Sequence, residues 1–243
     1  GSSLVGSEMC IRDSINADCI YHLAADISIQ YSIENPTESY KNNVVGTLNV
    51  LEVARVLGIK KVVFSSTAAI YGSTSEPCLE TDRPDPLNPY SVSKLAGENL
   101  MKMYNDLYGI ETVSLRYFNV YGPRQAYKGQ YAPVIGIFQK QKFEGKPLTI
   151  IGDGNQTRDF IHVADVAHAN MMVAEKNIVG VFNVGSGIEH SVNQIADLTN
   201  SPHGKTTMPS REGEARRSIS DNTKLKSIGW QPRILLEAWI AKQ

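Results

Sequence analysis

Cysteine is scarce in this 243-residue sequence, and long apolar runs are absent. The three cysteines, Cys10, Cys19 and Cys78, are odd in number and form no CxxC pair, which argues against a disulfide-stabilised secreted domain. No uncharged apolar stretch approaches the roughly 18 residues that span a bilayer. The N-terminus also lacks a basic region followed by an apolar core, the pattern of an export signal. We therefore expect no membrane association and a cytoplasmic protein.

An excess of charge of either sign is missing as well. Lys and Arg number 24 against 25 Asp and Glu, and no basic cluster could follow a phosphate backbone. Nucleic acid is therefore not an expected partner. The five histidines show no HExxH or similar close spacing, so no metal site is predicted. The apolar content of 42% is that of an ordinary globular protein with a buried core.

Strand and helix patterns alternate through the first half of the chain. The apolar runs predict parallel strands buried on both faces. The expected helices begin near Pro36 and Pro89 and end at Gly58 and Gly109. Short connections between these elements favour an α/β fold with a doubly wound parallel sheet. The predicted strands are Asp18–Ala25, Lys61–Ser66 and Glu111–Tyr117.

Shorter, mixed elements follow Gly122-Pro123 and suggest a smaller substrate lobe. The expected elements are a helix at Val134–Phe143, a strand at Leu148–Ile151 and a helix at Val163–Ala174. We interpret residues 1–14 as a non-native tail, residues 15–122 as a partial cofactor-binding domain and residues 123–243 as mainly substrate-binding. No Pro/Gly/Ser-rich linker separates the last two parts, so we expect them to be interleaved.

Tyr90 and Lys94 form a YxxxK motif at the start of a predicted helix. Residues at i and i+4 face the same way. A lysine ammonium near a phenol favours the phenolate, so we expect a lowered pKa for Tyr90 and a role as acid/base. An amphipathic helix with no catalytic role would contain the same two residues, and the motif alone does not exclude it.

A second signal supports the catalytic interpretation. The run FSSTAAIYG (Phe64 to Gly72) places three hydroxyl side chains at the carboxyl end of a buried strand, where open α/β sheets bind ligands. A hydroxyl donor beside a Tyr/Lys pair suits hydride transfer to and from nicotinamide. The competing interpretation is that Ser65, Ser66 and Thr67 only satisfy loop amides.

The order of motifs resembles the extended short-chain dehydrogenases, and within them the UDP-glucose 4-epimerase family. The resemblance runs from Ile15 to the C-terminus and rests on HLAA, NNVVGTLNVLE, FSSTAAIYG, PYSVSK, RYFNVYGPRQ and GDGNQTRDFIHVADVA. It implies a Rossmann-like domain, NAD as cofactor, a nucleotide sugar as substrate and a homodimer.

The resemblance also implies a role for each matching residue. Thr67 takes the catalytic Ser/Thr position, Tyr90 is the acid/base, and Lys94 binds the nicotinamide ribose. The implied cofactor-binding residues are Leu23, Ala24, Ala25, Asn42, Ser65, Tyr90, Lys94 and Phe118. The implied substrate-binding residues are Thr67, Asn119, Arg158 and Arg211, the two arginines pairing with the diphosphate unless they form ion pairs with Asp159 and Glu212.

A glycine-rich turn of the kind that binds a cofactor pyrophosphate is not found in this sequence. Gly152-Asp153-Gly154 and Gly185-Ser186-Gly187 lack the third glycine and follow the predicted catalytic helix. In the family this turn precedes the HLAA strand. We therefore expect a first βαβ unit to be missing, and the chain as printed to be inactive and to bind NAD poorly.

Three activities remain open within this interpretation. Family dehydratases and decarboxylases carry an acidic residue directly after the catalytic Ser/Thr, where this sequence has Ala68 and Ala69. That difference favours epimerisation at C4 through a 4-keto intermediate. The alternatives are a sugar-nucleotide dehydratase and a nucleotide-sugar-binding protein without turnover. The identity of the sugar, whether hexose, N-acetylhexosamine, uronic acid or pentose, stays open.

Overall fold

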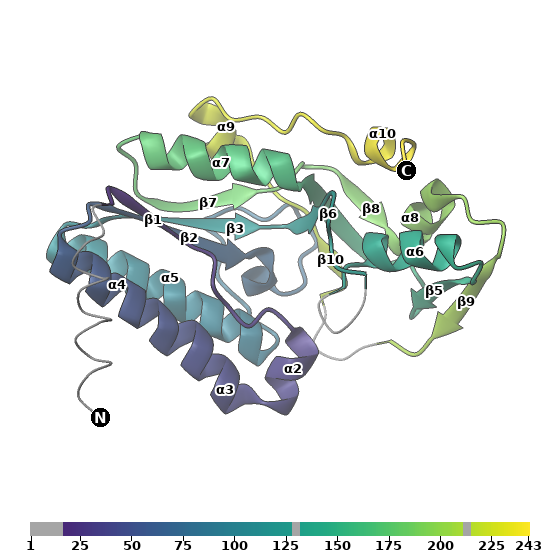
Figure 1. Cartoon of the computed structure of the whole chain (residues 1–243), viewed down its shortest axis with the longest axis horizontal. Coiled ribbons are helices and arrows are strands. Elements are labelled where there is room, and N and C mark those ends of the chain that lie inside the picture. The colour runs from purple at the N-terminus through teal and green to yellow at the C-terminus, as the bar shows by residue number, and fades with distance from the viewer. Residues whose placement is uncertain (1–16, 128–131, 211–214) are drawn as a thin grey trace, which may run out of the picture.

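The computed structural model describes residues 17–127, 132–210 and 215–243. A parallel four-stranded sheet forms one part, and smaller sheets with short helices form the other (Figure 1). The elements before Gly122 are β1 (Cys19–His22), α2 (Ile29–Glu34), α3 (Pro36–Tyr40), the π-helical turn η1 (Lys41–Val45), α4 (Gly46–Leu57), β2 (Lys61–Thr67), the 3₁₀ turn η2 (Ala68–Tyr71), α5 (Pro89–Tyr108), β3 (Glu111–Tyr117) and β4 (Asn119–Tyr121).

The later elements alternate between the two parts of the molecule. They are α6 (Val134–Phe143), β5 (Leu148–Ile151), β6 (Thr157–His162), α7 (Val163–Glu175), β7 (Gly180–Val184), β8 (Glu189–Ser191), α8 (Val192–Thr199), β9 (Lys205–Met208), β10 (Arg217–Ser218), α9 (Thr223–Ser227) and α10 (Leu236–Ile240). No helix within the described ranges combines the length and the apolar character that a membrane crossing requires.

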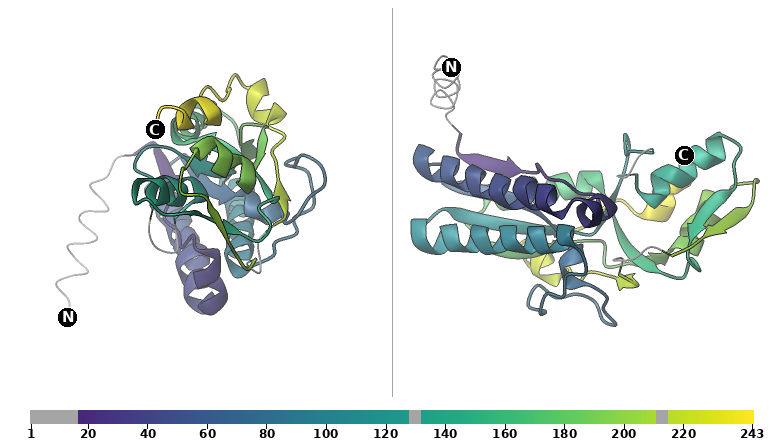
Figure 2. Two further views of the ribbon diagram at one scale, coloured as in Figure 1. Left: turned by 90° about the vertical axis from the view of Figure 1, so that its right-hand side faces the viewer. Right: turned by 90° about the horizontal axis from the view of Figure 1, so that it is seen from below.

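The main sheet has the strand order β1-β2-β3-β7, with every neighbouring pair parallel. Helices α4 and α5 lie side by side on one face and α7 covers the other (Figures 1 and 2). The fold is therefore doubly wound, as the alternation of strand and helix predicts. Because all four strands run the same way, the carboxyl ends of β1, β2 and β3 meet at one edge of the sheet.

Helix α5 begins with a well-formed cap and packs closely on the sheet. The side chain of Asn88 accepts a hydrogen bond from Ser91 N, and Ser91 Oγ accepts one from Asn88 N, which satisfies amides of the first turn. A Cβ at Gly97 would lie 2.6 Å from the ring of Phe64 on β2. Glycine at this position therefore allows the close approach that brings Lys94 to the end of β2.

The smaller part is built on β6. This strand pairs with β4 and β10 in parallel and with β8 in antiparallel fashion, while β5 pairs with β9. Its core contains Ile135 and Phe138 of α6 together with Phe160 and Ile195. Strand β4 follows β3 after one residue, so the chain passes directly from the main sheet into this second part.

Most predicted elements are confirmed, with three kinds of difference. The helix at Pro89–Tyr108 and the strands at Glu111–Tyr117 and Leu148–Ile151 have the expected bounds. The first strand, expected at Asp18–Ala25, is shorter at both ends and covers only Cys19–His22. The helix predicted to end at Gly58 is interrupted by the π-helical turn η1. Sequence periodicity also missed six strands, namely β4, β6, β7, β8, β9 and β10.

Candidate active site

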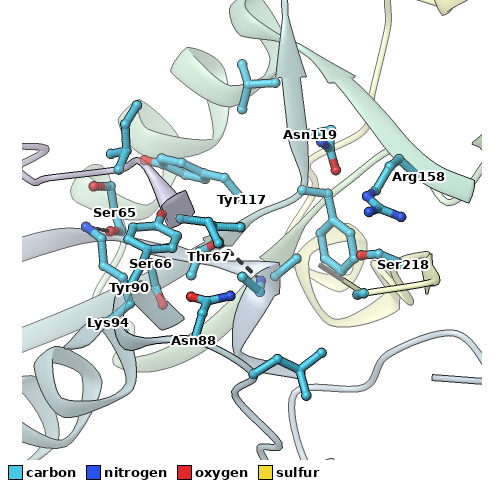
Figure 3. Close-up of a pocket in the computed structure, with 18 of the residues that line it drawn as sticks. Ser65, Ser66, Thr67, Asn88, Tyr90, Lys94, Tyr117, Asn119, Arg158 and Ser218 are labelled. Carbon is cyan, nitrogen blue, oxygen red and sulfur yellow. Dashed lines mark hydrogen bonds between the residues drawn. The ribbon is translucent and has the colours of Figure 1, made fainter. Parts of the chain in front are cut away.

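A cavity of about 530 Å³ opens at the carboxyl ends of the parallel strands; we call it the Tyr90 cavity (Figure 3). Strand β2 contributes its last three residues, and α5 contributes Tyr90 and Lys94. The other side is closed by residues of β4, β6 and β10. The labelled lining residues are Ser65, Ser66, Thr67, Asn88, Tyr90, Lys94, Tyr117, Asn119, Arg158 and Ser218.

Thr67 ends β2 with extended backbone and caps the turn η2. Its Oγ1 accepts a hydrogen bond of 3.2 Å from Ala69 N, so its own hydroxyl proton is directed elsewhere. Thr67 also lies close enough to Tyr90 to lower the pKa of its phenol, and both side chains line the cavity. The structure thus brings together two of the three residues to which the sequence assigned catalysis.

Lys94 lies one helical turn beyond Tyr90 and is 2% exposed. Its Nζ donates a 2.8 Å hydrogen bond to the carbonyl oxygen of Ser65 and lies 4.8 Å from the ring centroid of Phe64. Burial lowers the pKa of Lys94 from 10.5 to about 8, because removing the ammonium from water disfavours its charged form. The charged Lys94 at the cavity wall therefore lowers the stability of the folded protein.

The expected lowering of the Tyr90 pKa is wrong for the protein without a bound cofactor. Burial raises the pKa of Tyr90, and the nearby Thr67 side chain offsets only part of that rise. Lys94 does not produce the expected effect because its ammonium is directed to the Ser65 carbonyl. Tyr90 therefore carries its proton at neutral pH in this structure, the form needed to protonate a ketone oxygen or alkoxide.

Sequence reasoning missed a buried ion pair that contacts the end of β2 at Ser66. Arg116 on β3 binds Glu98 on α5 through two hydrogen bonds of 2.9 and 2.7 Å, and both side chains are 5% exposed. Ser66 Oγ donates to the same carboxylate. The available signal was spacing, because Glu98 follows Lys94 by four residues as Lys94 follows Tyr90. This network joins α5, β2 and β3 at the point where the candidate catalytic residues emerge.

The implied cofactor residues divide into two groups. Leu23, Ser65 and Phe118 line the Tyr90 cavity together with Tyr90 and Lys94. Ala24, Ala25 and Asn42 are not among its lining residues; Asn42 is exposed and its amide donates to Asp26 Oδ2 at 3.4 Å. The buried amide in that segment belongs to the next residue, Asn43.

Two of the implied substrate residues, Asn119 and Arg158, lie on the opposite side of the cavity from Tyr90 (Figure 3). Asn119 begins β4 and lines both the Tyr90 cavity and a second cavity of about 370 Å³ beside α6, which we call the α6 cavity. Arg158 on β6 also lines both, and its Nη1 donates 2.8 Å to the carbonyl of Thr157. Arg211 lies outside the described residues.

The ion pair suggested between Arg158 and Asp159 is replaced by a different arrangement. The Asp159 carboxylate is fully buried and accepts hydrogen bonds from Ser186 N, Gly187 N and Ser220 N. The hydroxyls of Ser186 and Ser220 also donate to it. The Gly185-Ser186-Gly187 turn therefore uses its amides to hold a carboxylate of the protein itself, which explains why it follows a strand yet is not a phosphate site.

The charged side chains that line the described part of the Tyr90 cavity are all basic. Lys94 and Arg158 line it, and no aspartate or glutamate is found among its described lining residues. Ala68 and Ala69 occupy the wall next to Thr67. Within the described ranges, no group of three His, Cys, Asp or Glu side chains could hold a metal ion. The cavity thus suits an anionic ligand and offers one acid/base, Tyr90.

The buried Lys94 ammonium leads to a stability prediction. The folded-state pKa of about 8 lies below the ordinary 10.5, so below pH 8 the charged lysine costs roughly 3 kcal/mol relative to the unfolded chain. We expect Lys94→Met to raise the unfolding free energy at pH 7 by about 1–3 kcal/mol, because the lost hydrogen bond to Ser65 offsets part of the gain. Denaturant titration measures this difference.

Because the pKa of Lys94 is lowered on folding, its charge reduces the stability of the protein at low pH, and this cost disappears as the pH rises. Between pH 8 and 10.5 the unfolded chain binds the proton that folded Lys94 has released, so wild-type stability rises relative to the variant. The advantage of Lys94→Met should therefore disappear towards pH 10.5. Lys102→Met on the same helix, where the lysine is exposed, is the control. A pH-independent difference for Lys94→Met would contradict this account.

Comparisons with known proteins agree with this geometry. The model of the NAD dependent epimerase/dehydratase family matches residues 8–185. A UDP-glucose 4-epimerase of Mycolicibacterium smegmatis is 38% identical, covering 93% of this chain and 74% of the relative. A UDP-glucuronate 4-epimerase of Thermodesulfobacterium geofontis is 34% identical, covering 93% of this chain and 71% of the relative.

Among solved structures, the UDP-glucose 4-epimerase of Thermotoga maritima with UDP-glucose superimposes with a TM-score of 0.91 at 37% identity, covering 98% of this chain and 80% of that one. The likeness in fold therefore extends over nearly all of this chain. The family match, the relatives and the Thr67, Tyr90 and Lys94 arrangement point the same way. This chain belongs to the NAD-dependent epimerase/dehydratase family.

Proposed function

We propose that this protein catalyses NAD-dependent epimerisation of a UDP-hexose at C4 through a 4-keto intermediate. One observation carries the proposal: Tyr90 lines a cavity whose described lining residues include no carboxylate, so Tyr90 is our candidate for its acid/base. Eliminating water or carbon dioxide from the sugar requires a further acid/base, whereas inverting a hydroxyl by oxidation and reduction needs one group that moves one proton. Ala68 and Ala69 beside Thr67 therefore support epimerisation over dehydration.

The residues that line the cavity fit the nicotinamide end of the cofactor. Leu23 and Ile27 offer exposed apolar surface and line the same cavity as Lys94 and Tyr90. NAD, when bound, supplies the acceptor and donor of hydride. In our proposal Lys94 donates to the nicotinamide ribose and orients it against β2. The described residues do not include a glycine-rich turn for the pyrophosphate.

The protein's own part in the reaction is proton transfer and orientation. Thr67 hydrogen-bonds the C4 oxygen and Tyr90 exchanges the proton of that oxygen. Tyr90 must act as a base in the first half-reaction and as an acid in the second. Because burial raises its pKa, the acid half-reaction is favoured by the protein alone, and the base half-reaction depends on positive charge nearby.

In this proposal the UDP part of the substrate binds on the side of the Tyr90 cavity that is formed by Asn119 and Arg158. Arg158 and Asn119 stand between the Tyr90 cavity and the α6 cavity, where a diphosphate would join sugar to nucleoside. Arginine suits this role because its guanidinium pairs with phosphate oxygens in a bidentate way. Relatives are named for both glucose and glucuronate, so the sugar itself is left as a hexose.

The test is turnover of UDP-galactose by the complete gene product supplied with NAD. We expect UDP-glucose to form until equilibrium is reached, with no net consumption of NAD. Formation of a dehydrated 4-keto-6-deoxy sugar would select the dehydratase instead. Binding of UDP-galactose without any product in the NAD-loaded protein would select a binding protein. Activity with no bound or required nicotinamide would also contradict the proposal.

The homodimer and the cytoplasmic location expected from the sequence stay predictions. Exposed apolar side chains on the solvent-facing side of α4 and α5 support pairing with a second copy of the chain, since such residues are stabilised when a partner covers them. They include Leu48, Val56, Met103, Leu107 and Tyr108.

A further inference from the structure

The π-helical turn η1 changes which asparagine of the Asn42-Asn43 pair faces inward. In this turn Gly46 N donates to the carbonyl of Lys41, five residues earlier. The extra residue shifts the helical phase, so that Asn43 is 3% exposed while Asn42 faces solvent. Such turns are rare and occur often at functional sites. The hydrogen-bond partners of the Asn43 side chain should therefore explain why this asparagine is buried.

Asn43 binds the backbone of the loop that follows β1. Its Oδ1 accepts a 2.7 Å hydrogen bond from Asp26 N, and its Nδ2 donates 2.9 Å to Asp26 O. One carboxamide thus satisfies both polar groups of a single residue, as a neighbouring strand would. Asp26 lies between Leu23 and Ile27, the two residues of this loop that form the apolar wall of the Tyr90 cavity.

The same carboxamide also reaches the catalytic helix. Its Nδ2 donates 2.9 Å to Ser93 Oγ, and Ser93 Oγ donates 2.7 Å to the carbonyl of Tyr90. A parallel contact comes from α2, where Ser32 Oγ accepts from Tyr90 N at 3.1 Å; this amide stands in the first helical turn and has no partner within the helix. The apolar wall and the Tyr90 turn are therefore joined through Asn43.

A second connection fixes Asn43 from behind. The hydroxyl of Thr47 donates 2.6 Å to the carbonyl of Asn43, and His22 Nε2 lies 3.0 Å from the same hydroxyl oxygen. Since Thr47 uses its proton on Asn43, His22 must donate to Thr47. Burial, together with the charge of Lys94, lowers the pKa of His22 to about 4, which keeps the imidazole neutral at physiological pH.

The geometry points to Asn43 as a positioning residue. It holds the loop that follows β1, which contains Leu23 and Ile27, against the first turn of α5, which contains Tyr90. This inference rests on the proposed function for the identity of the cofactor. Asn43 touches no reacting atom; it determines the distance between Leu23 and Ile27 on one side and Tyr90 and Lys94 on the other. Both sides must contact the same nicotinamide ring, so the separation they keep controls cofactor affinity.

The variant Asn43→Asp tests this role, because it keeps the shape and the acceptor but loses both N–H donors. We expect the dissociation constant for NAD of the complete gene product to rise at least about tenfold, with the constant for UDP unchanged. Turnover at saturating NAD should fall far less than NAD affinity. Amide hydrogen exchange of residues 23–29 should accelerate. Asn49→Asp, an exposed asparagine on α4, is the matched control and should change none of these.

Three outcomes separate the possibilities. Folded Asn43→Asp that binds NAD as tightly as wild type would overturn the assignment, whatever happens to its melting temperature. If Asn43→Asp does not fold, Ser93→Ala decides, since it removes only the contact to the Tyr90 turn; at least about threefold weaker NAD binding supports the assignment and unchanged binding overturns it. Wild type that binds NAD but turns over no UDP-sugar would remove the proposed function and leave the role of Asn43 in place.

Discussion

Replacing Tyr90 by phenylalanine is expected to lower UDP-hexose turnover by about 10²-fold or more, because it removes the acid/base while keeping the ring in place. Binding of UDP should barely change, since Arg158 and Asn119 lie on the opposite side of the cavity. Steady-state turnover and calorimetric titration with UDP measure the two effects.

The matched control is Tyr108→Phe at the far end of the same helix, where the side chain is exposed. It should leave turnover unchanged. If Tyr90→Phe keeps more than half of the wild-type turnover, Tyr90 is not the acid/base and the proton must move through Thr67 alone.

Among the substitutions proposed here, replacing Arg116 should lower the unfolding free energy most. Arg116→Met leaves the Glu98 carboxylate buried with only the hydroxyl of Ser66 as a partner, and breaking a buried ion pair in this way costs about 3–5 kcal/mol. We expect denaturant titration to show an unfolding free energy lower by that amount. Combining it with Glu98→Gln should recover part of the loss, because the unpaired charge is then gone.

An exposed ion pair provides the comparison. Arg55 binds Glu52 with similar geometry on the surface of α4, where water screens the charges. Arg55→Met should lose only a small part of what Arg116→Met loses. Equal losses from the two substitutions would show that burial of the Arg116–Glu98 pair does not determine its contribution.

Local patterns were sufficient to predict the centre of the site. Pro89 at the first turn and Gly109 at the end defined α5, and the hydroxyl run at the end of β2 identified the edge of the sheet. Tyr90 and Lys94 line the cavity because i, i+4 spacing on a helix is set by the backbone alone. Thr67 joins them because parallel strands end at the same edge.

What the sequence did not reveal depends on contacts between distant residues. The π-helical turn arises where Asn43 binds Asp26, 17 residues away, and Ser93, 50 residues away; no local periodicity encodes it. Strand β7 pairs with β3 at Val113 and Gly180, which are 67 positions apart in the sequence. The pKa of Tyr90 was misjudged because the direction of the Lys94 ammonium is set by the carbonyl of Ser65.

The central claim is that hydrogen at C4 leaves the sugar as hydride and returns to the same carbon, while Tyr90 handles only the proton on oxygen. The direct test is conversion of UDP-galactose carrying deuterium at C4 by the complete, NAD-loaded gene product in ordinary water. The account predicts UDP-glucose that retains the deuterium at C4 with inverted configuration. Loss of the deuterium to solvent would contradict it.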